Sequence, residues 1–193
     1  MTSVFVTVTG QDDNLGDSLL RRGYLSALHR LGVLHILVSG QSDGYVSGLG
    51  EWDGAKWYRD PSAWERALGA DLVRGRRPVW ALNAGEAQVR DGHEYVGARF
   101  ALRQRAVKLL GGRVIQTGLG IRDARTAHPS ARLVRFVRAC DVVSWRDADS
   151  AAAVGLGEVT PDWAFALPSA RDFDDGVRES VVISMRGDRA APG

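Results

Sequence analysis

Short runs of apolar and β-branched residues alternate along this chain with amphipathic segments, and this alternation constrains the fold more than any other feature. Residues 4–9 predict a buried strand and residues 33–39 predict another. Between them, apolar residues recur at helical spacing over residues 20–31, and Gly32 ends the helix. Strands joined through a helix in this way lie parallel, with a right-handed crossover. The sequence therefore predicts an α/β fold with a Rossmann-like, doubly wound parallel sheet.

The alternation continues along the rest of the chain. Further strands are expected at residues 78–82, 113–117, 141–145 and 158–160, with a short one near Lys56-Trp57-Tyr58 in an otherwise irregular stretch, 40–60. Helices are expected at residues 61–68, 95–109, 130–139 and 147–154. In the long helix expected at residues 95–109, the residues expected to share one apolar face are Tyr95, Ala98, Leu102, Ala106 and Leu109. In the third, the residues expected to face inward are Leu133, Phe136, Val137 and Cys140.

The length of 193 residues accommodates one well-buried domain and part of another. We expect residues 1–168 to form an N-terminal Rossmann-like domain and residues 169–179 to be a polar linker. Residues 180–193 begin with an apolar run that needs a sheet to join, so we expect them to supply the first strand of a second domain.

Composition narrows the class of protein. With 45% hydrophobic and 25% charged residues, and no apolar run near the roughly 18 residues of a membrane span, the chain is expected to be globular and without such a span. The opening residues do not resemble a signal peptide, which favours the cytoplasm. A net charge of +2 without a Lys/Arg block does not indicate nucleic-acid binding. The single cysteine and the scattered histidines predict neither an internal disulfide nor a metal site.

Polar or glycine-rich clusters follow several predicted strands, where ligands bind in open parallel sheets. They are Asn14-Leu15-Gly16-Asp17, Gly85-Glu86, Gly118-Leu119-Gly120 and Arg146-Asp147. Each cluster also has a purely structural interpretation, because Asn and Asp are preferred helix caps and glycines serve tight turns. None contains the three spaced glycines of a dinucleotide fingerprint, so no nicotinamide or flavin cofactor is expected.

Five segments, taken in order, resemble motifs of the polysaccharide pyruvyltransferase family. Asn14-Leu15-Gly16-Asp17 is similar to its N-x-G-D loop, which precedes a leucine-rich helix, and residues 116–121 resemble its G-Q-G-I-G-P segment. Residues 142–150 resemble V-S-x-R-D-x-x-S, and residues 161–167 resemble D-P-A-F-x-L. Residues 181–186 resemble the strand that opens the family's C-terminal domain. Together the segments span nearly the whole chain.

The sequence departs from the family pattern at three places. Asn83-Ala84-Gly85-Glu86 stands where the family has a triple-glycine turn. Ile121 and Trp163 stand where it has prolines.

The resemblance implies the N-terminal, acceptor-side half of a two-domain architecture similar to GT-B glycosyltransferases. Known members transfer the enolpyruvyl unit of phosphoenolpyruvate to sugar hydroxyls as a ketal and release phosphate. We therefore expect a saccharide acceptor, phosphoenolpyruvate as donor co-substrate and no cofactor. The family's C-terminal arginine and histidine motifs have no counterpart in these 193 residues, so we expect little or no transferase activity from the chain alone.

The same resemblance assigns roles to residues. Arg146 is expected to hold an oxyanion with its planar guanidinium, and Asp17 to contact a sugar hydroxyl or act as general base. Asp147 and Asp162 are expected to orient Arg146 or to brace loops, and Ser150 to cap locally. The full set expected to bind substrate is Asn14, Gly16, Gly85, Glu86, Gly118, Gly120, Asp147, Ser150, Asp162 and Arg186.

Two other functions stay open at this point. The same architecture hosts glycosyltransferases that use a nucleotide sugar, because a fold does not fix a function. A non-catalytic domain that binds a saccharide or another protein is the second alternative.

Overall fold

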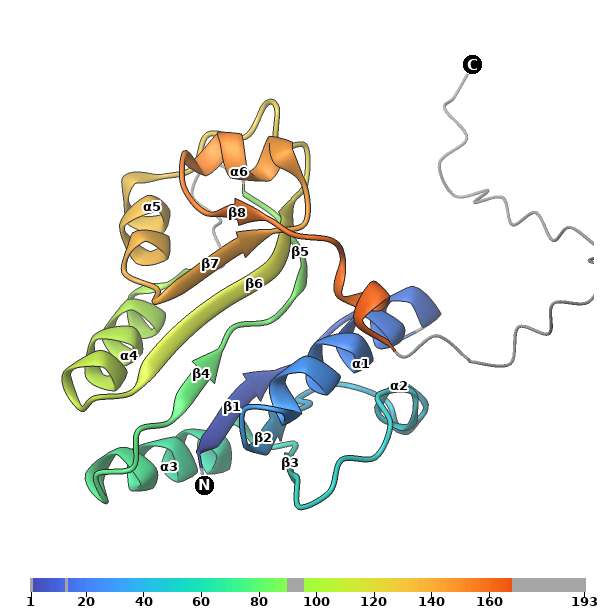
Figure 1. Ribbon diagram of the computed structural model, residues 1–193, viewed down its shortest axis with the longest axis vertical. Coiled ribbons are helices and arrows are strands. Elements are labelled where there is room, and N and C mark those ends of the chain that lie inside the picture. The colour runs from blue at the N-terminus through green and yellow to red at the C-terminus, as the bar shows by residue number, and fades with distance from the viewer. Residues whose placement is uncertain (1, 13, 90–95, 168–193) are drawn as a thin grey trace, which may run out of the picture.

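The computed structural model describes residues 2–12, 14–89 and 96–167, and within them it contains one parallel sheet flanked by helices (Figure 1). The sheet has eight strands in the order β3-β2-β1-β4-β6-β7-β8, with β5 paired to the carboxyl half of β6. The strands are β1 (Ser3–Thr7), β2 (Val33–Leu37), β3 (Lys56–Tyr58), β4 (Val79–Ala81), β5 (Gly85–Ala87), β6 (Arg113–Ile121), β7 (Val142–Trp145) and β8 (Glu158–Val159). The helices are α1 (Leu15–His29), α2 (Asp43–Gly48), α3 (Pro61–Val73), α4 (Ala98–Leu109), α5 (Ala131–Arg138), α6 (Ala148–Val154) and the 3-10 helix η1 (Trp163–Ala166).

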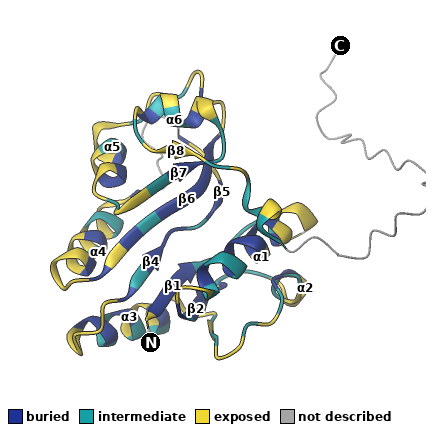
Figure 2. Ribbon diagram, in the orientation of Figure 1, coloured by how far each residue is buried: buried dark blue, intermediate teal, exposed yellow. Residues whose placement is uncertain are grey.

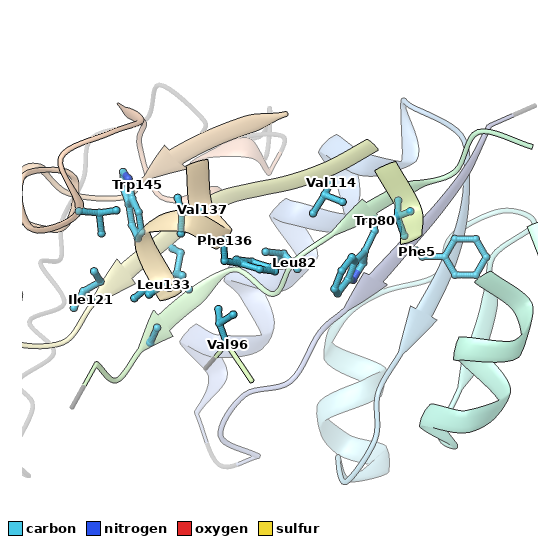
Figure 3. Packing of buried hydrophobic residues seen from close by; sticks show 14 of the residues in the cluster. Phe5, Trp80, Leu82, Val96, Val114, Ile121, Leu133, Phe136, Val137 and Trp145 are labelled. Carbon is cyan, nitrogen blue, oxygen red and sulfur yellow. The ribbon is translucent and has the colours of Figure 1, made fainter. Parts of the chain in front are cut away.

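Each face of the sheet has its own hydrophobic core, because side chains alternate along a strand. Val4 and Val6 of β1 pack with side chains of α1 and α2, and we call this side the α1 face. Phe5 belongs to the other core, with side chains from α3, α4, α5 and α6, and we call that side the α3 face (Figure 3). Helices on both faces of an all-parallel sheet confirm the predicted Rossmann-like α/β class.

Burial follows the predicted pattern in most elements. The central strands are largely buried, the edge strands β3 and β8 are largely exposed, and the helices bury one side and expose the other (Figure 2). In α5, Leu133, Phe136 and Val137 are buried as predicted, and Cys140 just beyond the helix is half-buried.

The order of the strands places a reversal of chain direction beside β1. From β1 the chain moves through β2 to β3, and it then returns to β4 on the other side of β1. The loops after β1 and β4 therefore diverge at neighbouring strand ends. In open α/β sheets this is the place where ligands bind.

The stretch predicted as irregular, residues 40–60, contains a helix as well as the expected β3. Ser42 caps α2 by accepting a hydrogen bond from the N–H of Tyr45 at 3.1 Å. Three glycines or serines in this six-residue helix hid its periodicity. Helix α3, predicted at 61–68, extends to Val73 behind its cap Asp60.

The face predicted for the long helix is wrong. Leu102 and Leu109 are 69% and 85% exposed, whereas Gln104 and Val107 of α4 are buried. The cause lies in Arg103, whose guanidinium carbon lies 5.2 Å from the ring centre of Trp80. Tyr95 lies outside the described residues.

Two glycine-containing clusters predicted as loops are strands. Gly85 and Glu86 belong to β5, and Gly118 to Gly120 belong to the second half of β6. The two segments pair with each other in parallel register, Gly85 with Leu119. The sheet therefore continues towards its carboxyl end beyond the point that the sequence predicts.

The linker and second-domain predictions, residues 169–179 and 180–193, lie outside the described residues, as does residue 168 at the end of the first domain. Among the described helices, none has both the length and the apolar character that crossing a membrane requires.

A late segment of the chain completes the α1 face. After β8 the chain passes to η1, which packs against α1 (Figure 1). The ring centre of Trp163 lies 5.3 Å from that of Tyr24. A side chain at Gly23 of α1 would overlap the carbonyl group of Trp163, and one at Gly118 would overlap its indole ring. Two glycines far apart in the sequence thus make room for one tryptophan.

Candidate functional site

A polar cavity of about 590 Å³ opens at the carboxyl end of the sheet, beside the reversal between β1 and β4. Its walls come from the loop after β1, the start of α1, and the segments at the ends of β4, β5, β6 and β7. The predicted site residues that line it are Asn14, Asp17, Glu86 and Arg146. Residues from three of the four sequence clusters therefore converge, as expected for one edge of a parallel sheet.

Helix α1 forms one wall of this cavity. Asn14 caps the helix, since its Oδ1 accepts a hydrogen bond from the N–H of Gly16 at 3.0 Å. Asp17 Oδ1 accepts from Nη1 of Arg21 at 3.0 Å, and Asp17 Oδ2 accepts from the N–H of Gln11 at 2.8 Å. Asp17 thereby joins α1 to the loop after β1, and both of its oxygens are engaged.

The strand ends form the opposite wall through a shared carboxylate. Glu86 Oε1 pairs with Arg122, and Glu86 Oε2 accepts from Nη2 of Arg146 at 3.3 Å. The side chains of Glu86 and Arg146 are each about 30% exposed, so a ligand can reach them. Gly120 lies against Arg146, where any side chain would overlap the guanidinium stem. This row of charges is exposed and held by strands β5, β6 and β7.

Asn83 connects the two loops at the chain reversal. Its Nδ2 donates to the carbonyl oxygen of Thr9 at 3.0 Å and to Thr9 Oγ1 at 3.2 Å. A Cβ at Gly10 would lie 2.8 Å from both Asp17 Oδ2 and Tyr45 Oη. Close approach at Gly10 therefore brings the loop after β1 down onto the start of α1.

Several predicted residues stand beside the lining side chains or support them. Gly16 takes part in the cap of α1, and Gly85 lies against Arg21. Asp147 caps α6 through the N–H of Ser150 at 2.7 Å, and its Oδ2 lies 3.9 Å from Arg146 Nε. Both interpretations of Asp147, as a helix cap and as a neighbour of Arg146, agree with this geometry.

The remaining predicted residues are not among those that line the cavity. Gly118 donates its N–H to Ser144 Oγ at 3.3 Å and is covered by Trp163. Ser150 is fully buried, and its hydroxyl accepts from the N–H of Ile121 at 2.8 Å. Asp162 caps η1. Gly118 and Ser150 thus brace the strand ends, and Asp162 holds the start of η1. Arg186 lies outside the described residues.

Sequence reasoning missed several polar residues of the cavity. Arg21 stands one helical turn after Asp17, and that spacing is the signal that could have identified the pair. Arg122 follows the Gly118-Leu119-Gly120 segment by two residues and could have been found as the end of the same strand. Gln11, Asn83 and Gln88 lie in irregular segments, for which no sequence pattern indicates where a side chain points.

Two other hollows help to define the site. One of about 320 Å³ shares Gln88 and Arg122 with the polar cavity, so the polar surface continues past β5 towards His128. The other, of about 920 Å³, lies at the amino end of the sheet and is bordered by Thr2, Val79 and Val142. It is larger, but three charged residues line it, against five in the polar cavity. Convergence of charges therefore distinguishes the carboxyl end, and size alone does not.

The comparisons with known proteins returned no match to a family model, a curated protein or a solved structure. Among the described residues, no three His, Cys, Asp or Glu side chains gather as metal ligands would. The chemistry that this site supports is therefore judged from its own groups. Three arginines, two carboxylates and four side-chain amides face one cavity, an arrangement that can bind hydroxyl groups and anions.

Proposed function

We propose that this chain provides the acceptor-side domain of a polysaccharide pyruvyltransferase-like enzyme, which transfers the enolpyruvyl unit of phosphoenolpyruvate to a saccharide. One observation carries the proposal. Asn14, Asp17, Glu86 and Arg146, which the motif resemblance and strand ends single out, line the same cavity. Amide, carboxylate and guanidinium groups together match a ligand with many hydroxyl groups that reacts with an anion.

The proposed reaction joins two hydroxyl groups of the acceptor to one phosphoenolpyruvate. The first hydroxyl oxygen bonds to C2 of the donor while a proton adds to its methylene carbon, which becomes a methyl group. The second hydroxyl oxygen then bonds to C2 as phosphate leaves with its bonding electron pair. One hydroxyl proton is balanced by the new methyl hydrogen and the other by the released phosphate, so no oxidant or reductant takes part.

Arg146 and Asp17 have distinct roles in this proposal. The guanidinium of Arg146 receives a donor oxyanion in exchange for its hydrogen bond to Glu86, which at 3.3 Å is long for a charged pair. Asp17 accepts the hydrogen of an acceptor hydroxyl at Oδ2, in exchange for the N–H of Gln11. The neighbouring hollow beyond Gln88 offers room for further units of the saccharide.

Calorimetric titration of the 193-residue chain tests the proposal. The probes are methyl glucopyranoside, methyl galactopyranoside, methyl mannopyranoside, phosphoenolpyruvate and UDP-glucose. We expect binding of at least one glycoside, and a loss of affinity of about tenfold or more in Asp17→Asn, as expected when a charged hydrogen bond is lost. Arg146→Gln should lower the affinity for phosphoenolpyruvate by a similar factor.

Arg132→Gln is the matched control, because Arg132 is an exposed arginine on α5, on the α3 face. It should bind every probe as the wild type does. Binding of UDP-glucose with no response to the glycosides or phosphoenolpyruvate would favour a nucleotide-sugar glycosyltransferase instead. Glycoside binding that both site variants leave unchanged would contradict the assignment of this cavity.

A further inference from the structure

Arg21 is a buried arginine in the wall of the polar cavity. Its residue is 3% exposed, although it borders the cavity from α1. Nη1 donates to the carbonyl oxygen of Asp17 at 3.2 Å and to Asp17 Oδ1 at 3.0 Å. Nε is buried and has no hydrogen-bond partner among the described residues. Buried charged groups are normally satisfied, so an unpartnered N–H here calls for a cause.

The unused donors of Arg21 lie on one side of its guanidinium. Nε–H and one Nη2–H point in parallel and together form the side-on fork that grips a carboxylate or phosphate through two hydrogen bonds. The described hydrogen bonds of Arg21 use Nη1, and none uses Nη2. The pairing with Asp17 therefore anchors the guanidinium by one corner and leaves the fork without a partner.

Gly85 makes the position of this guanidinium possible. Its φ of +118° is a conformation that side chains disfavour, and a Cβ there would lie 2.5 Å from Arg21 Nη2. Strand β5 thus passes close to the fork, one residue before Glu86. Arg21 consequently lies between the α1 wall and the strand-end wall of the cavity.

A second unpartnered donor lies near the same place. The hydroxyl of Tyr45 is buried and without a hydrogen-bond partner among the described residues, and a Cβ on the cavity residue Gly10 would lie 2.8 Å from it. Burial raises the pKa of Tyr45 to about 12, so the hydroxyl keeps its proton at neutral pH. Arg21 Nε and Tyr45 Oη are thus unsatisfied donors in or beside the cavity lining, and Asn83 Oδ1 of the lining is an unsatisfied acceptor. Together they indicate a site for a ligand that offers both acceptor oxygens and hydroxyl hydrogens.

The charge of the cavity lining also favours an anionic ligand. The lining of the cavity holds three arginines against two carboxylates. Glu86 is shared by Arg122 and Arg146, whereas Asp17 occupies a single nitrogen of Arg21. An anion would therefore find Arg21 already fixed in place and would not have to displace Glu86.

We propose that Arg21 forms an oxyanion subsite in this cavity, which selects ligands that carry a carboxylate or a phosphate beside their hydroxyl groups. The inference rests on the proposed function in that it uses the same cavity, and it adds a charge requirement that pyruvyl transfer to a neutral sugar does not have. Carboxylate and phosphate share the chemistry that a guanidinium fork recognises.

Nuclear magnetic resonance of the wild-type chain tests the contact directly. Arginine Nε–Hε groups give their own signals, and the signal missing from Arg21→Lys identifies that of Arg21. Titration with inorganic phosphate, and separately with acetate, should shift the Arg21 signal in a saturable way. Shifts of other arginine signals with an unmoved Arg21 signal would overturn the proposal. This measurement needs no folded variant other than the one used for assignment.

Calorimetry with matched sugars tests the selectivity. Glucose, glucuronate and glucose 6-phosphate share a ring and differ in charge, and we expect one of the charged sugars to bind at least about tenfold more tightly than glucose. Arg21→Lys, which keeps the charge and loses the planar fork, should reduce this ratio of affinities to less than about threefold. Arg132→Lys should preserve the full advantage.

The outcomes separate the two proposals. Equal binding of glucose and both charged sugars overturns the oxyanion subsite and leaves the saccharide site in place. An advantage that persists in Arg21→Lys also overturns it. If no sugar binds, the proposed function fails; a saturable shift of the Arg21 signal by phosphate alone would then still support an anion site.

Discussion

On the α3 face of the sheet, the covering helices α3 to α6 follow one another along the chain, whereas the α1 face is covered by α1, α2 and the much later segment η1. The α3 face is held by buried tryptophans, among them Trp64, Trp80 and Trp145. The α1 face also supplies the charged residues Asp17 and Arg21 to the cavity. The α3 face therefore mainly stabilises the fold, whereas the α1 face both packs against the sheet and supplies residues to the site.

Helix-interior glycines offer the sharpest test of this difference. Gly23 of α1 and Gly69 of α3 occupy comparable helical positions, but a Cβ at Gly23 would overlap the Trp163 carbonyl, and one at Gly69 would meet nothing within 4 Å. We expect Gly23→Ala to lower the free energy of unfolding by about 3 kcal/mol, because overpacking outweighs the gain in helix propensity.

Gly69→Ala, the matched control, should instead raise the free energy of unfolding by up to about 1 kcal/mol. Urea denaturation followed by circular dichroism measures both changes. If Gly23→Ala were as stable as Gly69→Ala, η1 would not pack against α1 as described.

The α3 face contains a histidine whose protonation state matters. His35 is 6% exposed, its ring stacks on Phe5 at 4.2 Å, and its Nδ1 lies 2.9 Å from the hydroxyl of Tyr58. Burial, reinforced by the charge of Lys56, lowers the pKa of His35 from 6.5 to about 4. The folded protein therefore keeps this ring neutral over a range in which the unfolded chain protonates it.

Stability should accordingly fall as the pH drops from about 6.5 to about 4, by as much as about 2 to 3 kcal/mol, because the unfolded state binds the extra proton. Above that window both states are neutral and the effect vanishes. Subtracting the stability of His35→Phe at each pH isolates this contribution from that of the carboxylates. A difference between the two proteins that stays constant from pH 7 to pH 4 would refute it.

Helix α4 tests how the α3 face is assigned. Val107 is fully buried and Leu102 is 69% exposed, opposite to the face that the sequence predicts. Val107→Ala should cost about 2 kcal/mol of unfolding free energy, whereas Leu102→Ala should change it by less than about 0.5 kcal/mol. Comparison of their urea midpoints decides the matter, and a larger loss for Leu102→Ala would restore the predicted face.

Much of the fold could be predicted because its signals are local. Strands such as Val33–Leu37 and helices such as α5 have clear periods, and the crossover rule then gives a parallel sheet. The buried face of α4 was predicted wrongly because Arg103 lies against the rings of Trp64 and Trp80. A charged residue that covers aromatic rings counts as polar in any pattern.

The site could be predicted in part for the same reason. Parallel strands bring their carboxyl ends to one edge, which is why Asn14 and Arg146 share a cavity. The packing of Trp163 across Gly23 and Gly118 depends on contacts between distant segments, and no local pattern encodes them. The same holds for Asn83, whose amide bridges to Thr9 across 74 residues of sequence.

Both proposals require a ligand to bind in the polar cavity at the carboxyl end of the sheet. Mapping of backbone amide shifts on the ¹⁵N-labelled chain, titrated with phosphoenolpyruvate and with the methyl glycosides, tests it most directly. We expect saturable shifts at Gly10, Gln11, Gln88 and Arg122. Shifts gathered instead at Thr2, Gly111 and Arg113, around the larger cavity at the amino end, would contradict it.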